Sequence, residues 1–427
     1  MNLARQAAET RSALATAWAR LPEPMRGPTQ FLGRQIAGCG AVIGAMPKCD
    51  FSCTGCYLGE DANKARPSSV EEIRKQLREI RAWLGPVGNV QMTDGEVSLR
   101  DEREVIGLIR YAREIGLVPM LMTHGETFRR KPGLLERLMV EGGLSEISVH
   151  IDTTQRGRRD HYATARTEPE LDPLRAEFAD IIREARRKTA RPLTAASTVT
   201  VTRGNLDGVA GIVRFFLTHA DAFKMVSFQP LAEVGRTNPE LRGVAPDELW
   251  ARIAEGTGDP DIRRGEGWLG HPACTRFVQG VAVNRAKDRG PRLVPIFRRD
   301  QPDEMRALNE YFDRAGGLSF RLDTTSQALR RLAGFAMRHG MFALTRLVPQ
   351  LIKLCWRAGT LRANYFSIVS HHFMSAAEIA TPLGQERLDA CAFQVPIHGE
   401  LKSMCAVNAL GLREEFYRAG KPAVVEV

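Results

Sequence analysis

The feature that most constrains this chain is a group of three cysteines within eight residues. Cys49, Cys53 and Cys56 follow the spacing C-x3-C-x2-C, and the whole chain contains eight cysteines. A loop with this spacing can wrap its thiolates around one corner of an iron–sulfur cube, in which each of the four irons needs a ligand. Because the loop lacks a fourth cysteine, one iron of a [4Fe-4S] cluster would stay open to a small molecule. The fold must therefore place this loop where a small molecule can reach it.

Two other uses of clustered cysteines compete with this interpretation. Structural zinc favours paired C-x2-4-C knuckles, and no second pair of this kind occurs in the sequence. A disulfide needs an oxidising compartment. The residues from Met1 to Arg26 lack the apolar core of a signal peptide, and no run of about eighteen apolar residues is present that could span a bilayer. We therefore expect a cytoplasmic protein whose cysteines are ligands or buried thiols.

The stretch from Met46 to Tyr57 closely resembles the cluster-binding loop of the radical S-adenosylmethionine (radical SAM) superfamily. The resemblance implies that the open iron binds the amino and carboxylate groups of SAM. Reduction would then break the sulfonium S–C5′ bond and release a 5′-deoxyadenosyl radical, so the cofactor carries the chemistry while the protein places it and excludes water. One position departs from the family, since many members carry an aromatic residue where this chain has Gly55.

The residues after the motif alternate between strand and helix patterns. A capping box from Ser69 to Glu72 begins a helix whose apolar residues repeat at helical spacing up to Gly85. Six strands that alternate with helices predict a parallel sheet with right-handed crossovers, in a barrel or a doubly wound sheet. The predicted strands cover residues 41–46, 89–93, 118–123, 146–151, 195–202 and 224–229, and the predicted helices cover 70–84, 104–115, 134–141, 174–188 and 206–219.

The family resemblance selects one of these two architectures. It implies an α/β fold built on a partial (β/α)6 barrel of the TIM type, with the active site at the carboxyl ends of the strands, where βα loops assemble such sites. We predict an N-terminal helical segment at residues 1–38, a radical SAM core barrel at 39–243 and a mostly helical auxiliary region at 244–427.

Residues directly after the second strand are candidates for binding SAM. Gly95 and Glu96 stand where family members carry a Gly-Gly-Glu-Pro motif that binds the methionyl ammonium group. Asp94 and Val97 replace the first glycine and the proline of that motif. An ammonium group needs acceptors, and a glycine lets the backbone approach it closely. The alternative is a plain strand-to-helix turn with a capping acid.

The fourth strand places polar side chains on one face. Ser148, His150 and Asp152 share that face because side chains alternate along a strand. In relatives, polar residues here contact SAM, so we expect Ser148 and Asp152 to line the cofactor pocket. An internal hydrogen-bond network is the alternative. Residues on the fifth strand alternate in the same way, and His124 after the third strand could face the substrate or shape the turn.

Three further cysteines, Cys274, Cys391 and Cys405, lie in the C-terminal part. The ending around Cys405 distantly resembles the tail of radical SAM enzymes related to tetraether lipid synthase, in which cysteines outside the barrel bind further metal centres. This resemblance implies a second [4Fe-4S] cluster on these three thiols, with Cys355 or an exogenous group as the fourth ligand. Buried free thiols, which behave as small apolar residues, are the alternative.

The charge of the chain favours an anionic partner. The formal net charge is +10 and the pI about 9.4. Residues 324–377 contain no acidic residue but seven Lys or Arg. Such a segment suits a membrane surface or an anionic substrate, and the alternative is a packed helix pair with a solvated basic face. No nucleic-acid-binding motif is present.

These observations lead to one principal hypothesis and two competitors. We expect a radical SAM enzyme that takes electrons from a donor such as flavodoxin or ferredoxin. It would abstract hydrogen from an unactivated C–H bond of a small molecule or a lipid, with peripheral contact to a membrane. The first competitor is a non-catalytic zinc- or Fe-S-bearing protein that binds nucleic acid or membrane through its basic face. The second directs the same radical chemistry at RNA or a peptide.

Overall fold

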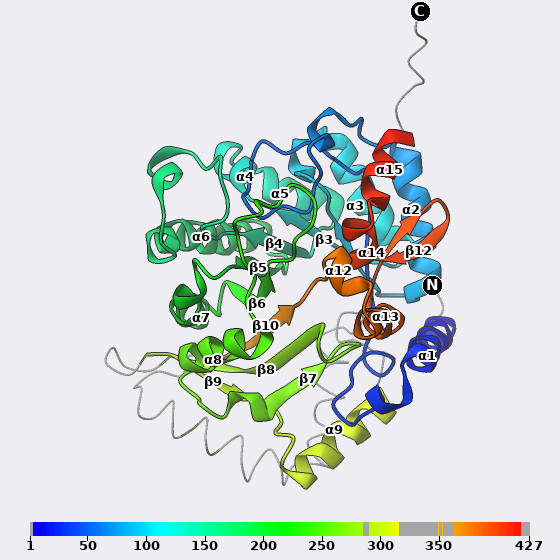
Figure 1. Cartoon of the computed structure of the whole chain (residues 1–427), viewed down its shortest axis with the longest axis vertical. Coiled ribbons are helices and arrows are strands. Elements are labelled where there is room, and N and C mark those ends of the chain that lie inside the picture. The colour runs from blue at the N-terminus through cyan, green and yellow to red at the C-terminus, as the bar shows by residue number, and fades with distance from the viewer. Residues whose placement is uncertain (1–2, 285–289, 316–348, 350–351, 353–362, 420–427) are drawn as a thin grey trace, which may run out of the picture.

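The computed structural model describes residues 3–284, 290–315, 349, 352 and 363–419. Within these residues, twelve strands form one sheet in the order β12-β11-β1-β2-β3-β4-β5-β6-β10-β8-β7, with β9 paired to β8. The sheet curls into a partial barrel that helices cover from outside (Figure 1). The strands are β1 (Cys39–Ala41), β2 (Asn89–Met92), β3 (Val118–Thr123), β4 (Glu146–His150), β5 (Thr194–Val201), β6 (Phe223–Pro230), β7 (Glu266–Trp268), β8 (Thr275–Val283), β9 (Arg292–Pro295), β10 (Ala363–His371), β11 (Phe393–Ile397) and β12 (Glu400–Ser403).

The six strands β1 to β6 run parallel to one another, and helices connect them. This arrangement confirms the predicted partial (β/α)6 barrel. The α-helices of the described residues are α1 (Leu3–Arg20), α2 (Val70–Leu84), α3 (Glu102–Glu114), α4 (Glu126–Arg130), α5 (Leu134–Arg137), α6 (Asp172–Thr189), α7 (Val209–Thr218), α8 (Pro246–Thr257), α9 (Pro302–Ala315), α12 (Ala376–Ile379), α13 (Pro382–Asp389), α14 (Met404–Ala409) and α15 (Leu412–Ala419). Short 3-10 helices cover Glu23–Met25, Ala62–Lys64, Val97–Leu99, Asp160–Thr164, Pro169–Leu171, Leu206–Gly208 and Ile262–Gly265, and a π-helical turn covers Leu138–Gly142.

Helix α2 shows how the local sequence defines an element. The Ser69 side chain accepts a hydrogen bond from the Glu72 backbone at 3.2 Å, and the Glu72 carboxylate accepts one from the Ser69 backbone at 2.6 Å. This reciprocal capping box satisfies two free N–H groups at the start of the helix. The apolar residues at helical spacing, Ile73, Leu77, Ile80 and Leu84, are all buried.

The first strand lies earlier in the chain than its apolar residues predict. It spans Cys39–Ala41, whereas the prediction placed it at residues 41–46. Gly44 has a φ of +78°, which bends the chain out of the extended conformation on its way to the cysteine loop. Ile43 and Ala45 are nevertheless fully buried, so the apolar run reflects burial rather than strand pairing.

The C-terminal region extends both edges of the barrel sheet. Strand β11 pairs in parallel with β1, and β10 pairs in parallel with β6. The hairpin expected between Cys391 and Cys405 is present as β11 and β12. The described part of this region therefore contains strands as well as helices, because the open edges of the barrel provide unpaired backbone groups for them.

The chain packs around a continuous hydrophobic core. This core joins Leu14 of α1, Val90 of β2 and Phe366 of β10. The boundaries drawn at residues 38 and 243 stay predictions. Most of the basic stretch 324–377, together with Cys355, lies outside the described residues. Among the described residues, no helix is both long and apolar enough to cross a membrane.

Candidate active site

A cavity of about 200 Å³ opens at the carboxyl ends of the barrel strands. One part of its wall comes from residues at or just beyond the strand ends, including Thr93, His124, His150, Thr200 and Pro230. The opposite part comes from the C-terminal region, through Phe373, Met374, Phe393, Met404, Cys405 and Asn408. The cavity therefore lies between the barrel and the C-terminal elements that flank it.

The three cysteines of the motif all line this cavity. Burial raises the pKa of Cys53, and the nearby Cys56, Asp152 and Cys49 raise it further through their negative charge. Burial likewise raises the pKa of the Cys56 thiol, although Arg236 opposes this. The three sulfurs are therefore close enough to affect one another electrostatically, and a bound cation would favour the deprotonated forms of Cys53 and Cys56.

In the described part of the chain, the three thiols of the motif do not form one compact group of metal ligands. Zinc–sulfur bonds of about 2.3 Å would bring the ligand atoms of one zinc ion within about 4.6 Å of one another. Among the residues that the structure describes, the single group of metal-ligating side chains this compact is Cys49 with Asp50 and His124. Cys53 and Cys56 lie outside that group, so the triad is spread more widely than a mononuclear site. Three thiols on one loop match in number the ligands of a cluster that keeps one iron open.

Two segments on either side clamp the cysteine loop in place. The backbone N–H groups of Ser52 and Thr54 donate to the carbonyls of Arg156 and Thr154, each at 2.9 Å. On the other side, Gly235 has a φ of +57°, and a Cβ there would lie 2.4 Å from the Tyr57 backbone. The segments that follow β4 and β6 therefore fix the loop through its backbone.

Gly55 has a physical explanation in this arrangement. A Cβ at Gly55 would lie 2.5 Å from the side chain of Leu231, which follows β6 and lines the cavity. Leu231 therefore occupies the space that a larger side chain at position 55 would need.

The turn at Gly95 and Glu96 is hydrogen-bonded directly to the cysteine loop. The Gly95 N–H donates to Met46 and the Glu96 N–H donates to Lys48, both at 2.8 Å. A Cβ at Gly95 would lie 2.4 Å from the carbonyl oxygens of Pro47 and Lys48. Glycine is therefore required because the cysteine loop approaches this turn so closely.

Glu96 is buried, and its carboxylate is held by three side chains or backbone groups. One oxygen accepts from the Ser98 hydroxyl at 2.5 Å and from the Thr123 hydroxyl at 2.7 Å, and the other accepts from the His124 N–H at 2.8 Å. The residue also lines the cavity. These hydrogen bonds fix the orientation of an anionic group at the cavity wall.

His124 packs against the cysteine loop. Its ring stacks on Phe51 at a centroid distance of 3.8 Å, and its Nε2 lies 2.8 Å from an Asp50 carboxylate oxygen. Burial lowers the pKa of His124, but the charge of Glu96 and the hydrogen bonds to Asp50 and Cys49 outweigh burial and raise it to about 10. The compact group of Cys49, Asp50 and His124 is thus explained by an ion pair.

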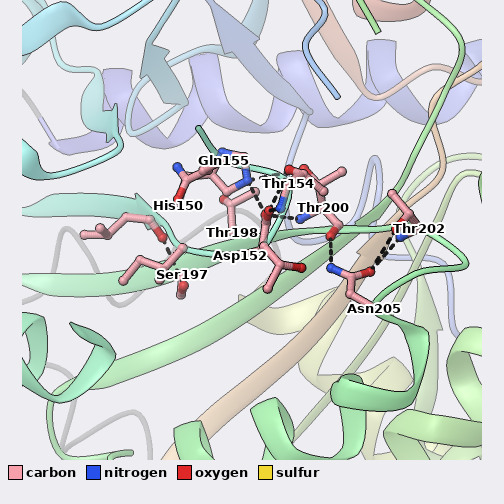
Figure 2. A network of polar contacts seen from close by, with 12 residues as sticks. His150, Asp152, Thr154, Gln155, Ser197, Thr198, Thr200, Thr202 and Asn205 are labelled. Atoms are coloured by element: carbon pink, nitrogen blue, oxygen red, sulfur yellow. Dashed lines mark hydrogen bonds and ion pairs between the residues drawn. The ribbon is translucent and has the colours of Figure 1, made fainter. Parts of the chain in front are cut away.

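A polar network joins the ends of β4 and β5 (Figure 2). Ser148 lines the cavity and shares a 2.9 Å hydrogen bond with Thr198. His150 also lines the cavity, and its Nε2 lies 2.5 Å from an Asp152 carboxylate oxygen. The hydrogen-bond network that was the alternative to cofactor contacts is therefore present, and it orients one imidazole toward the cavity.

Asp152 itself does not line the cavity, which corrects the expectation that it shares a wall with Ser148. Strand β4 ends at His150, so the alternation of side chains does not continue to position 152. Asp152 is fully buried behind the wall and accepts hydrogen bonds from Thr154, Thr200 and His150. Burial raises its pKa, but the charge of His150 and these hydrogen bonds outweigh burial and hold the pKa below the usual value.

The second set of cysteines converges from three separate segments. Cys274 follows β7, Cys391 precedes β11, and Cys405 lies in α14. Burial raises the pKa of Cys391 to about 11, and the charge of Cys274 contributes. Burial also raises the pKa of Cys405 to about 12, with contributions from both Cys391 and Cys274. The fold therefore brings these three thiols within electrostatic range of one another, and Cys405 reaches the cavity wall.

Two polar side chains accompany this second set. The buried Arg387 donates from Nε to the Cys274 sulfur at 3.2 Å and from Nη2 to the His372 carbonyl at 2.7 Å. The Nε2 atom of His372 is buried without a hydrogen-bond partner. Cys355, which the sequence offered as a fourth ligand, lies outside the described residues.

Several cavity residues could not be identified from the sequence. Arg236 follows β6 and donates from Nη2 to the Phe51 carbonyl at 3.3 Å. Gln155 is buried at the cavity wall, and its Nε2 has no hydrogen-bond partner. Neither belongs to a recognisable motif, and only the loops that follow their strands bring them to the site.

The core of the chain matches one protein family. Residues 43–215 match the model of the Radical SAM superfamily. Over 200 residues the chain is 24% identical to 7,8-dihydro-6-hydroxymethylpterin dimethyltransferase from Methanocaldococcus jannaschii, a match that covers 46% of this chain and 37% of the relative. The chain thus spans little more than a third of that relative's length.

Solved structures show limited similarity. SuiB of Streptococcus suis bound to S-adenosylmethionine is 14% identical, with a TM-score of 0.39 over 53% of this chain and 48% of SuiB. The protein anSMEcpe, with bound AdoMet and the Cp18Cys peptide, is 15% identical, with a TM-score of 0.36 over 53% of this chain and 60% of its own. These TM-scores are too low to support an argument about the fold, so the fold is described from the strand order of this chain.

Proposed function

The chain is a member of the radical SAM superfamily, and we propose that it cleaves SAM at a [4Fe-4S] cluster held by Cys49, Cys53 and Cys56. When bound, the cluster supplies the electron that breaks the S–C5′ bond, and the resulting 5′-deoxyadenosyl radical takes a hydrogen atom from an unactivated C–H bond. One observation carries the proposal. Three thiols on a clamped loop line a cavity at the carboxyl ends of the barrel strands.

The turn after β2 would position SAM. We assign to Gly95 and Glu96 the binding of the methionyl ammonium group. The Glu96 carboxylate is oriented by Ser98 and Thr123 and lies on the cavity wall, where it would accept from an ammonium group. A group held in this way loses little conformational entropy when its ligand binds.

The network at the ends of β4 and β5 would contact the rest of the cofactor. Ser148 and His150 present polar atoms to the cavity. Asp152 would affect the cofactor only through His150, because its carboxylate forms a 2.5 Å hydrogen bond with the His150 ring and so fixes the orientation of the imidazole. Replacing Asp152 would therefore affect the cofactor site indirectly, through the orientation of His150.

We also propose a second [4Fe-4S] cluster at Cys274, Cys391 and Cys405. The proximity of the three thiols supports this proposal. Burial is the main cause that raises the pKa of Cys391 and of Cys405, the charge of Cys274 adds to both shifts, and the charge of Cys391 adds to that of Cys405. The Arg387 N–H directed at the Cys274 sulfur would stabilise a thiolate ligand.

The substrate and the final product are open to direct test. The curated relative is a dimethyltransferase by name, so methyl transfer to carbon is the first outcome we would test. A lipid or another anion remains the substrate class that the net charge of +10 favours. We propose flavodoxin or ferredoxin as the electron donor, and we place the protein in the cytoplasm with peripheral membrane contact.

Anaerobic reconstitution tests the proposal. We expect about four irons per chain for one cluster or about eight for two. Incubation with SAM and a low-potential reductant should then release 5′-deoxyadenosine, and replacing Cys56 with Ala should abolish this product. A chain that retains zinc only, or a cluster that leaves SAM intact, would instead support the non-catalytic binding protein. Liposome sedimentation and a nucleic-acid gel shift, each repeated at raised salt, would then identify its partner.

A further inference from the structure

The last two helices pack against the cysteine loop. Tyr417 of α15 and Val407 of α14 share a small hydrophobic core with Ile43 and Leu58, which flank that loop, and Tyr57 packs against this core. In Figure 1 these helices lie at the C-terminal end of the colour scale, beside the barrel. The C-terminal segment therefore contacts the part of the chain that would hold the cofactor.

Two glycines show how closely α15 approaches. A Cβ at Gly44 would lie 2.9 Å from the Phe416 ring, and a Cβ at Gly59 would lie 2.6 Å from the Glu414 carboxylate. Gly44 precedes the cysteine motif and Gly59 follows it. Side chains of α15 thus occupy space on both sides of the loop.

A fully buried carboxylate links this helix to the SAM-binding turn. Asp94 precedes Gly95 and has a φ of 152°, a conformation that favours glycine. Its carboxylate accepts a hydrogen bond from the Gly44 N–H at 2.5 Å and one from the Tyr417 hydroxyl at 2.5 Å, and it pairs with the Arg413 guanidinium. The aspartate that departs from the family's glycine is therefore held by contacts from α15.

The same guanidinium extends this network to the cysteine loop and to the cavity. Arg413 lies 4.8 Å above the ring of Tyr57, which directly follows the last cysteine of the motif. Its Nε and Nη2 atoms donate to the Asn408 side-chain oxygen at 3.1 and 3.0 Å, and Asn408 lines the cavity. The Tyr57 hydroxyl donates in turn to the Asp94 carbonyl.

We propose that Asp94, Arg413 and Tyr417 form a clasp through which the C-terminal helices position the SAM-binding turn and complete the cavity wall. This proposal rests on the proposed function, because it gives the clasp its effect on SAM. The three are positioning residues, since none of them is required to touch the reacting atoms. Without the clasp, Gly95 and Glu96 would keep their backbone hydrogen bonds to the cysteine loop but lose the support of α15.

The test compares two single variants, their combination and a control in the full-length reconstituted protein. Arg413→Leu leaves the Asp94 carboxylate buried without its cation, which destabilises a protein more than removing both partners does. Asp94→Gly removes the carboxylate and places a glycine where the φ favours one. Arg418→Leu changes an exposed arginine of the same helix and serves as the control.

Two measurements separate positioning from a purely structural role. We expect Arg413→Leu to weaken SAM binding, measured by equilibrium dialysis, by about tenfold or more, the usual loss when a supporting residue is removed. It should also lower the melting temperature. The Asp94→Gly/Arg413→Leu double variant should regain most of the melting temperature but keep the weakened SAM binding. If SAM affinity returns together with the melting temperature, or never changes, the clasp does not position the turn.

Further variants keep the test decisive. If Arg413→Leu does not fold, the double variant and Tyr417→Phe, which removes one donor, replace it. Hydrogen exchange of residues 404–419 does not require SAM, and we expect protection there to fall in Asp94→Gly but not in Arg418→Leu. If the wild-type protein itself fails to bind SAM, the proposed function is wrong. If hydrogen exchange of residues 404–419 stays unchanged in Asp94→Gly, the clasp is wrong whether or not the protein binds SAM.

Discussion

The two cysteine triads of this protein are built in opposite ways. Cys49, Cys53 and Cys56 come from one loop, and their spacing alone indicates a shared centre. The second triad comes from the segment after β7, the segment before β11 and helix α14. Its three cysteines come together only because strands β10 and β11 extend opposite edges of the barrel sheet. A local motif can therefore be recognised from spacing, whereas a site assembled across the fold leaves only scattered residues in the sequence.

The histidines beside the two triads differ in charge for a clear reason. His124 lies beside Cys49 and faces the carboxylates of Glu96 and Asp50, which overcome the effect of burial and raise its pKa to about 10. His372 lies beside Cys274; burial lowers its pKa to about 3, and the guanidinium groups of Arg276 and Arg387 contribute to this shift. Similar burial thus gives opposite protonation states, and the neighbouring charges decide which one.

The largest effect should separate the roles of the triads. We expect Cys53→Ala to abolish 5′-deoxyadenosine formation and to remove about four irons per chain. Cys391→Ala should also remove about four irons but leave SAM cleavage without substrate intact. Iron analysis and product chromatography measure both quantities.

The control for these variants is Cys39→Ala, because Cys39 lies in β1 and belongs to neither triad. If Cys391→Ala leaves the iron content unchanged, the second triad is a set of buried thiols. If Cys391→Ala abolishes SAM cleavage as Cys53→Ala does, the division of roles drawn here is wrong.

A second prediction tests the close approach at the first triad. Gly95→Ala places a methyl group 2.4 Å from two carbonyl oxygens, so the turn must move away from the cysteine loop. We expect a loss of about 1–3 kcal/mol in the free energy of unfolding, the usual cost of overpacking, together with loss of SAM binding. Urea titration and equilibrium dialysis measure these quantities.

The matched control for that turn is Gly107→Ala in α3, where a Cβ would contact no atom within 4 Å. That change should stabilise the helix by up to about 1 kcal/mol. Equal effects of the two substitutions would show that the turn does not depend on close contact with the loop.

A third prediction concerns the support of the second triad. Arg387→Met removes the N–H directed at the Cys274 sulfur while keeping much of the side-chain volume. We expect the second centre to lose iron to a chelator about tenfold faster, with the first centre unaffected. Iron release followed by absorbance measures this difference. Unchanged release would show that Arg387 does not support the second centre.

The smallest effects concern pH. A free imidazole has a pKa of about 6.5, so the lowered pKa of His372 means that the unfolded chain binds more protons below that pH. Its contribution to stability is present above about pH 6.5 and decreases as the pH falls toward 3. The raised pKa of His124 has the opposite sign, because its contribution is present below about pH 6.5 and decreases as the pH rises toward 10.

Urea unfolding across this pH range measures both slopes. His372→Gln should flatten the acid side, and His124→Gln should flatten the alkaline side. His161→Gln, which changes an exposed histidine, should alter neither slope. A profile in which both variants act on the same side would contradict the contrast between the two histidines.

The sequence by itself determined the elements and the first triad. The capping box of α2 and the alternation of six strands with helices follow from patterns within a few residues, and local hydrogen bonding and side-chain periodicity act over that range. The choice of a partial barrel and the importance of Gly95 came from the family resemblance. The orientation of Asp152 was predicted wrongly because the sequence does not mark the end of β4 at His150.

Only the tertiary structure decided the rest. It brought Cys274, Cys391 and Cys405 together, and it placed Arg413 against Asp94 across more than three hundred residues of chain. Such contacts depend on which strands share an edge of the sheet and on which buried charges find a partner. Neither is encoded in spacing, because both result from packing the whole chain around one core.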